Sequence, residues 1–121
     1  LKDESIKIAT IKSKYSIISK NAVIKSGTIV MNNALINSGV EIGLNCIINS
    51  GAIVEHDSII GDHCHISTGA ILNGNVKIGS GSFIGSGCII KQNINVGEKV
   101  IISAGEKVMN DIPSNKIYKN F

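Results

Sequence analysis

Aliphatic residues recur every six positions along most of the chain. The sixteen residues at this spacing are Ile18, Ile24, Val30, Ile36, Ile42, Ile48, Val54, Ile60, Ile66, Leu72, Ile78, Ile84, Ile90, Val96, Ile102 and Val108. A second, mostly small class of residue precedes them by two positions, at Ala22, Thr28, Ala34, Val40, Cys46, Ala52, Ser58, Cys64, Ala70, Val76, Ser82 and Cys88. A period of six excludes an amphipathic helix, which repeats every ~3.6 residues, and a flat strand, which repeats every ~2.

A six-residue unit with one large and one small inward side chain predicts a short strand followed by a turn. The Gly and Asn residues that often follow the large residue adopt turn conformations readily. Such units bury a core only if the chain winds and each strand pairs with the strand one coil earlier, as in a parallel β-helix. With three units per coil, residues 18–112 form a triangular prism of about five coils.

Both ends of the chain depart from this repeat. Lys12 stands where an aliphatic residue is expected, so we predict an entry strand and an irregular first turn over 1–17. After Val108 the pattern stops at Asp111 to Pro113, and we expect a polar tail over 113–121. Nothing in the sequence marks a second domain.

Composition narrows the class of protein. Aromatic residues make up only 3% of the 121 residues, so Ile and Val must fill the core. The net charge of +3 predicts a solvated basic surface, or at most contacts to anionic phosphates, rather than a nucleic-acid partner. No apolar run reaches the ~18 residues of a membrane span, and the start is unlike a signal peptide. We therefore expect a cytoplasmic protein.

The three cysteines form no CxxC pair, and their number is odd. Cys46, Cys64 and Cys88 all occupy inward small positions of the repeat. We expect buried, reduced thiols that are poor nucleophiles.

The polar residues with candidate chemistry gather between Asn49 and Gly74, a stretch that contains all three histidines and the triplet Glu55-His56-Asp57. His56 follows inward-facing Val54 by two positions, which predicts a corner of the prism outside the core. Histidine ordinarily titrates near ~6.5, so a neutral imidazole can act as a general base that a carboxylate orients. The alternative is a solvated polar corner. A narrow prism has no internal pocket, so we expect a trimer with ligand sites between its copies.

The stretch NSGAIVEHDSIIGDHCHISTGAILNGNVKIGSGSFIGSGCII resembles the hexapeptide-repeat acyltransferases. Within that group it is similar to the sialic acid O-acetyltransferase family, whose relatives include acetyltransferases of nucleotide-linked amino sugars. The resemblance extends from about Ala9 to Pro113. It implies a left-handed parallel β-helix, a homotrimer with active sites between subunits, and acetyl-CoA as co-substrate.

The resemblance also implies roles for individual residues. His56 matches the general base and Asp57 the acid that orients it, while Glu55 and Asn49 lie beside them as substrate-binding residues. The positions that match the acetyl-CoA site are His65, Gly74, Phe83, Ser86 and Ala104.

A metal site is the less favoured alternative. Some hexapeptide proteins are zinc-dependent carbonic anhydrases, but here His56, His63 and His65 lie close together in the sequence, without a widely separated third ligand. We expect no metal, and we expect His63 to be exposed on a different corner.

Two departures from the family pattern concern the substrate. Relatives usually carry a small α/β domain before the β-helix, and this sequence starts almost at the repeat. The usual Ile-His-Pro entry is replaced by residues 11–13, Ile-Lys-Ser, so we expect either a fragment or a short stand-alone member. We predict acetyl transfer to an amino or hydroxyl group of a nucleotide-linked amino sugar or a sialic acid in bacterial surface glycan synthesis. The alternatives are a non-catalytic trimerisation or scaffold module and a zinc-dependent hydratase.

Overall fold

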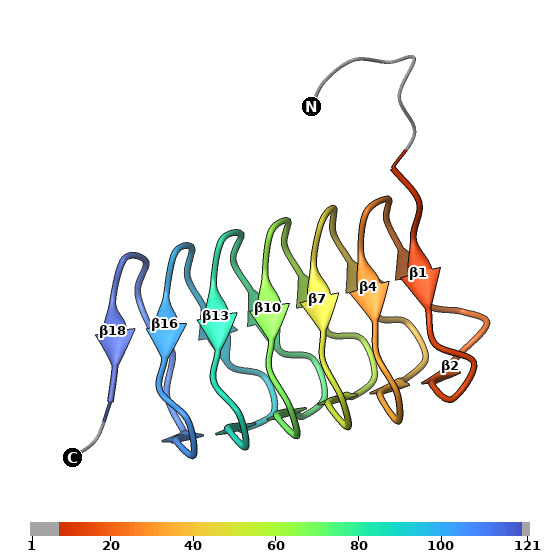
Figure 1. The fold of residues 1–121 in the computed structure, drawn as a ribbon. Helices are drawn as coiled ribbons and strands as arrows, with labels where there is room; N and C mark the ends of the chain where they lie inside the picture. The colour runs from red at the N-terminus through yellow and green to blue at the C-terminus, as the bar shows by residue number, and fades with distance from the viewer. Residues whose placement is uncertain (1–7, 120–121) are drawn as a thin grey trace.

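The chain winds into a prism of stacked coils built from two-residue strands (Figure 1). The structure, a computed structural model, describes residues 8–119. Residues 1–7 of the expected entry segment and residues 120–121 of the expected tail lie outside the described range. Residues 8–119 contain no helix, and hence none that is long and apolar enough to cross a membrane.

Three parallel sheets form the three faces of the prism. Sheet A contains β1 (Ile11–Lys12), β4 (Ile29–Val30), β7 (Ile47–Ile48), β10 (His65–Ile66), β13 (Phe83–Ile84), β16 (Ile101–Ile102) and β18 (Ile117–Tyr118). Sheet B contains β2 (Ile17–Ile18), β5 (Leu35–Ile36), β8 (Ile53–Val54), β11 (Ile71–Leu72), β14 (Ile89–Ile90) and β17 (Lys107–Val108). Sheet C contains β3 (Val23–Ile24), β6 (Glu41–Ile42), β9 (Ile59–Ile60), β12 (Lys77–Ile78) and β15 (Asn95–Val96).

Neighbouring strands of a sheet come from successive coils. His65 of β10 lies opposite Ile47 of β7 in the coil before it and opposite Phe83 of β13 in the coil after it. This register confirms the parallel β-helix expected from the hexads, and it fits the left-handed winding that the family resemblance implied. The stack has about six turns rather than the expected five, because β1 and β18 lengthen sheet A.

The repeat continues further at both ends than the sequence indicated. Lys12 lies opposite Val30, so it occupies an inward register position in the first coil, where it is exposed. In the last coil Val96 bridges to Ile112, a shorter step along the chain than the three hexads of the other coils. The hexads then resume out of phase with the earlier ones, and β18 lies within the expected tail.

The inward positions form one continuous core. The large aliphatic residues from Val30 to Val108 are all buried. Three small positions carry buried hydroxyls, Thr28, Ser58 and Ser82. Each hydroxyl donates a hydrogen bond to a backbone carbonyl in the next coil. It also accepts a hydrogen bond from the amide of the equivalent residue in that coil, so it joins the two coils.

The outward strand residues differ between the three faces. Sheet A presents Ile11, Ile29, Ile47, His65, Phe83, Ile101 and Ile117. Sheet B presents Ile17, Leu35, Ile53, Ile71, Ile89 and Lys107. Sheet C presents Val23, Glu41, Ile59, Lys77 and Asn95. Sheets A and B are therefore mainly apolar on the outside, whereas sheet C is mixed and charged.

Turns between the sheets form three corners, which we name A–B, B–C and C–A after the sheets that they join. Many corner residues have a left-handed backbone, which Gly and Asn adopt with little strain. On corner B–C this position is filled in successive coils by Gly39, Asp57, Asn75 and Asn93, with φ between 58° and 76°.

Candidate functional site

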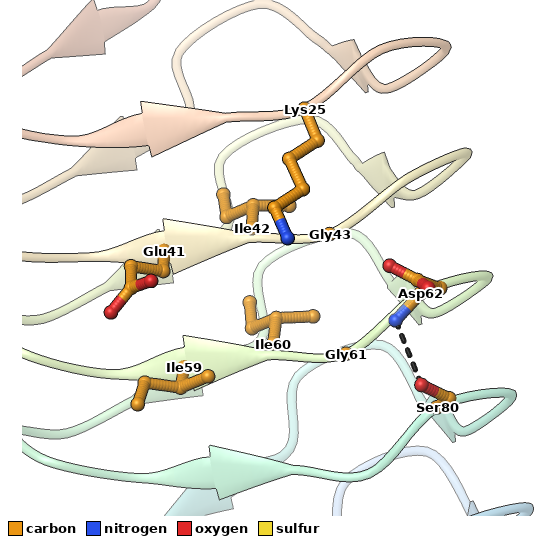
Figure 2. Close-up of a pocket in the computed structure, with 9 residues that line it drawn as sticks. All are labelled: Lys25, Glu41, Ile42, Gly43, Ile59, Ile60, Gly61, Asp62 and Ser80. Carbon is orange, nitrogen blue, oxygen red and sulfur yellow. Dashed lines mark hydrogen bonds between the residues drawn. The ribbon is translucent and has the colours of Figure 1, made fainter.

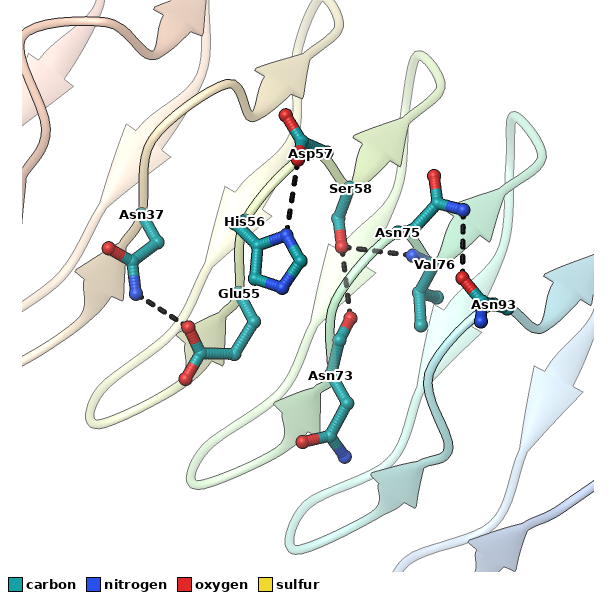
Figure 3. A network of polar contacts seen from close by, with 9 residues as sticks. All are labelled: Asn37, Glu55, His56, Asp57, Ser58, Asn73, Asn75, Val76 and Asn93. Atoms are coloured by element: carbon teal, nitrogen blue, oxygen red, sulfur yellow. Dashed lines mark hydrogen bonds and ion pairs between the residues drawn. The ribbon is translucent and has the colours of Figure 1, made fainter.

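His56 and Asp57 lie on corner B–C, directly after β8. The imidazole Nδ1 is 3.1 Å from Asp57 Oδ2, as Figure 3 shows. The side chains are 66% and 67% exposed, so a substrate can reach them from solvent. A carboxylate can only accept a hydrogen bond, so Asp57 favours the tautomer with its proton on Nδ1 and leaves Nε2 free to accept one.

Glu55 is held on the same corner by a residue from the preceding coil. Asn37 Nδ2 donates to Glu55 Oε1 at 2.5 Å (Figure 3). Asn37 was not among the expected site residues. The signal that could have identified it is that it precedes Glu55 by one full coil, which places the two side chains one above the other.

Gly74 lies one coil after His56, directly beside the imidazole ring. A Cβ at Gly74 would be 2.4 Å from His56 Nε2 and 2.6 Å from Cε1, well inside van der Waals contact. The ring therefore occupies the space that a side chain at residue 74 would fill. The sequence placed Gly74 with the acetyl-CoA site, and the structure places it beside the candidate base.

A second group of expected site residues lies on sheet A and the adjoining corner A–B. His65 and Phe83 stack edge to face across β10 and β13, with ring centroids 5.1 Å apart. Asn49 Nδ2 lies 3.2 Å from His65 Nε2. Asn49 therefore contacts His65, whereas the family resemblance implied a position beside His56. Burial lowers the pKa of His65, which favours the neutral imidazole.

Ser86 and Ala104 stand one coil apart on corner A–B. Ser86 Oγ is 2.8 Å from Ser67 Oγ, and Ala104 is exposed. The expected site residues thus fall into two groups at opposite edges of sheet B: His56, Asp57, Glu55 and Gly74 on corner B–C; and Asn49, His65, Phe83, Ser86 and Ala104 on sheet A and corner A–B. A single chain does not bring the two groups together.

His63 and the possible metal ligands add no residue to either of these two groups. His63 is exposed on corner C–A, whereas His56 lies on corner B–C and His65 on sheet A. No three His, Cys, Asp or Glu side chains within residues 8–119 are arranged to hold a metal ion.

The cysteine thiols are buried and bonded to carbonyls of the next coil. Cys46 Sγ donates to the Gly61 carbonyl and Cys88 Sγ to the Ser103 carbonyl. The pKa of Cys64 is raised, first by its contact with Cys46 and then by burial, and burial raises that of Cys88. The Cys64 thiol lowers the pKa of Cys46 to about 7, but that sulfur is inaccessible in the core. None of the three is placed to attack a substrate.

A shallow pocket of about 250 Å³ lies on sheet C (Figure 2). Its lining includes Lys25, Glu41, Ile59, Asp62 and Ser80. The pocket is at the edge of the sheet where the chain leaves β9, whereas His56 precedes that strand. It is therefore separate from both groups of candidate site residues.

The repeat, the fold and comparisons with known proteins identify the same class of protein. Residues 57–92 match the model of the bacterial transferase hexapeptide, six repeats. No curated protein matches the chain. Together with the β-helix, this match confirms the resemblance to the hexapeptide-repeat acyltransferases.

Solved structures narrow the resemblance to sugar acetyltransferases. The acetyltransferase domain of PglB from Neisseria gonorrhoeae is 35% identical over 89% of this chain, with a TM-score of 0.89. PerB from Caulobacter crescentus, solved with CoA and GDP-perosamine, is 31% identical over 88% of the chain, with a TM-score of 0.88. WeeI from Acinetobacter baumannii is 28% identical over 86% of the chain, with a TM-score of 0.83. The chain spans about half the length of these structures, 53%, 52% and 51% respectively.

Proposed function

We propose that this chain is the catalytic β-helix of an acetyl-CoA-dependent N-acetyltransferase that acts on a nucleotide-linked amino sugar. The observation that carries the proposal is the exposed His56–Asp57 pair, with Nδ1 bonded to a carboxylate and Nε2 available. The similarity to the PglB domain, which was solved with acetyl coenzyme A, and to PerB supports the donor and the class of acceptor. Bacterial surface glycan synthesis in the cytoplasm is the setting that we infer from these relatives.

The reaction proceeds by direct attack on the thioester. The amine nitrogen, already in its neutral form, attacks the acetyl carbonyl carbon, and the C–S bond breaks as the new C–N bond forms. His56 Nε2 takes the proton that the substrate amine loses, while Asp57 stabilises the resulting imidazolium. The imidazolium then returns the proton to the CoA thiolate. Oxygen attack from a sialic acid hydroxyl is the second acceptor chemistry, and it uses the same base.

The complete site forms between copies of the chain in a homotrimer. Sheets A and B present apolar faces, whereas sheet C is charged, so sheets A and B are the faces that association buries most favourably. When sheet A of one copy packs against sheet B of the next, corner B–C of that second copy lies at the edge of the seam. His56 then approaches the face of the neighbouring copy that carries His65 and Phe83.

The test is release of free CoA thiol from acetyl-CoA, measured with nucleotide-linked amino sugars, including GDP-perosamine, and with free sialic acids. We expect release with an amino sugar and a loss on the order of 10²-fold or more in His56→Ala. Gln92→Ala, two coils later on the same corner, is the matched control and should retain activity. Full turnover in His56→Ala would remove His56 from the mechanism. Failure of acetyl-CoA to bind would favour the scaffold alternative.

A further inference from the structure

Two glycines enclose the His56–Asp57 pair along the axis of the prism. Gly39 lies one coil before Asp57 in the same corner position, and a Cβ there would be 2.2 Å from Asp57 Oδ1. Gly74 lies one coil after His56, and its Cβ would be 2.4 Å from His56 Nε2. The carboxylate therefore extends over the first glycine and the imidazole over the second.

The backbone alone does not require glycine at residue 39. Its φ of +76° is left-handed, but Asn75 and Asn93 occupy the same corner position in later coils at φ of 58° and 64°. What distinguishes Gly39 is the atom that a side chain would meet, which is the end of the Asp57 side chain rather than backbone. Such a side chain yields by rotating, so the fold tolerates the substitution and the carboxylate moves.

Asn75 and Asn93 show where the carboxylate would go. In that pair of coils the earlier residue has a side chain, and Asn75 Nδ2 donates to Asn93 Oδ1 at 2.9 Å (Figure 3). An asparagine at residue 39 could donate to Asp57 in the same way. Asp57 would then bond along the ladder of corner residues and leave His56 Nδ1.

We propose that Gly39 and Gly74 are positioning residues of the acetyltransferase site: by lacking a Cβ they let Asp57 and His56 lie against each other with Nε2 directed at the acceptor. This inference rests on the proposed function for its catalytic meaning. The positions of the two side chains can be tested whether or not an acceptor is found.

The first test is the tautomer of His56, read from the ¹⁵N chemical shifts of its ring nitrogens in long-range ¹H–¹⁵N spectra at a pH where the ring is neutral. His56→Gln identifies the signals among the three histidines. Wild type should carry its proton on Nδ1, and Gly39→Asn should move the population towards Nε2–H. The matched control is Gly81→Asn, at φ +75° on corner C–A, where the nearest atom to a Cβ is Lys99 Cγ at 3.4 Å. It should leave the His56 shifts unchanged.

Two results of that measurement would overturn the proposal for Gly39. One is an Nε2–H tautomer in wild type, because Asp57 would then not orient the ring. The other is a Gly39→Asn spectrum identical to wild type. In the activity assay Gly39→Asn should lower kcat roughly tenfold or more, the size of a misplaced catalytic group, with the KM for acetyl-CoA unchanged.

Gly74→Ala tests the other side of the pair. Residue 74 has no left-handed backbone, so alanine adds only a methyl group that must displace the imidazole. We expect kcat to fall while the KM for acetyl-CoA and the melting temperature stay near wild type, with Gln92→Ala as the control. A higher KM for acetyl-CoA with unchanged kcat would instead assign Gly74 to the acetyl-CoA site, as the family resemblance implied. Absence of turnover in wild type would contradict the proposed function and leave the NMR test of Gly39 intact.

Discussion

Removing the hydroxyl of Ser58 tests how the coils are joined beside the candidate site. Ser58 is fully buried and follows Asp57 directly. Its Oγ donates to the Asn73 carbonyl at 3.1 Å and accepts from the Val76 amide at 3.1 Å (Figure 3). The hydroxyl is thus inserted into a turn of the next coil, between the carbonyl and the amide that would otherwise close that turn.

The structure itself shows how such a turn closes without a hydroxyl. One coil after Ala34, the Ala52 amide donates directly to the Asn49 carbonyl at 3.1 Å. In Ser58→Ala, the Val76 amide can bond to the Asn73 carbonyl in the same way. The substitution therefore exchanges two hydrogen bonds for one and leaves no buried polar group without a partner. The expected loss is about 1 kcal/mol of unfolding free energy, whereas an unsatisfied amide and carbonyl would together cost roughly 2–6 kcal/mol.

Urea denaturation at fixed protein concentration measures this difference, because association adds to the stability of an oligomer. A loss of about 1 kcal/mol corresponds to roughly 4 °C in melting temperature for a domain of this size. Ser82→Ala, where the hydroxyl joins the Gly97 carbonyl and the Val100 amide, should lose the same amount. A loss above about 3 kcal/mol in Ser58→Ala would show that the turn cannot close, and no loss would show that the hydroxyl contributes nothing.

Three further predictions concern the site. Asparagine suits the left-handed φ of 62° at residue 57, so Asp57→Asn should leave the melting temperature unchanged. It should lower CoA release roughly 10²-fold, because an amide can also present a donor to the ring of His56. Retained activity would contradict the orienting role of Asp57. Phe83→Ala removes the ring that stacks on His65 and should raise the KM for acetyl-CoA several-fold at unchanged kcat, whereas an unchanged KM would separate Phe83 from the donor site. Burial lowers the pKa of His65 in the folded protein. As the pH falls below ~6.5, the unfolded chain therefore protonates this imidazole before the folded protein does. The contribution of the neutral imidazole to the free energy of unfolding is present above that pH and is lost below it. The melting temperature of His65→Gln should therefore fall less steeply than that of wild type between about pH 7.5 and 5, and parallel curves would contradict this sign.

The fold follows closely from the spacing of aliphatic residues, because a strict period fixes which residues stack. Ile48, Ile66 and Ile84 are separated by one full coil each in the sequence and are adjacent in sheet A. The last coil was harder to predict, because it is shortened between Val108 and Ile112 and the period no longer aligns. The return of the hexad spacing between Ile112 and Tyr118 was the remaining signal for β18.

Contacts within the site were predictable only where they follow the coil period. The Asn37–Glu55 contact joins equivalent positions of successive coils and could have been read from the sequence. The contact between Asn49 and His65 joins positions that are not equivalent, and it depends on the direction of two side chains at a corner, which periodicity does not determine. The contact between His56 and Asp57 joins adjacent residues, and the rotamers that make it are likewise not determined by the period.

Repetition also supplies an internal reference for every position of the prism. Corner B–C holds Ser38, His56, Gly74 and Gln92 at equivalent places in four successive coils, so the fold accepts very different side chains there. The large inward positions, in contrast, are aliphatic in almost every coil because the core admits little else there. A histidine at such a tolerant corner, with a carboxylate beside it and a glycine against each of the two side chains, is not required for folding. We therefore attribute its arrangement to the proposed chemistry at the surface of the prism, and we expect the glycine substitutions to change catalysis more than stability.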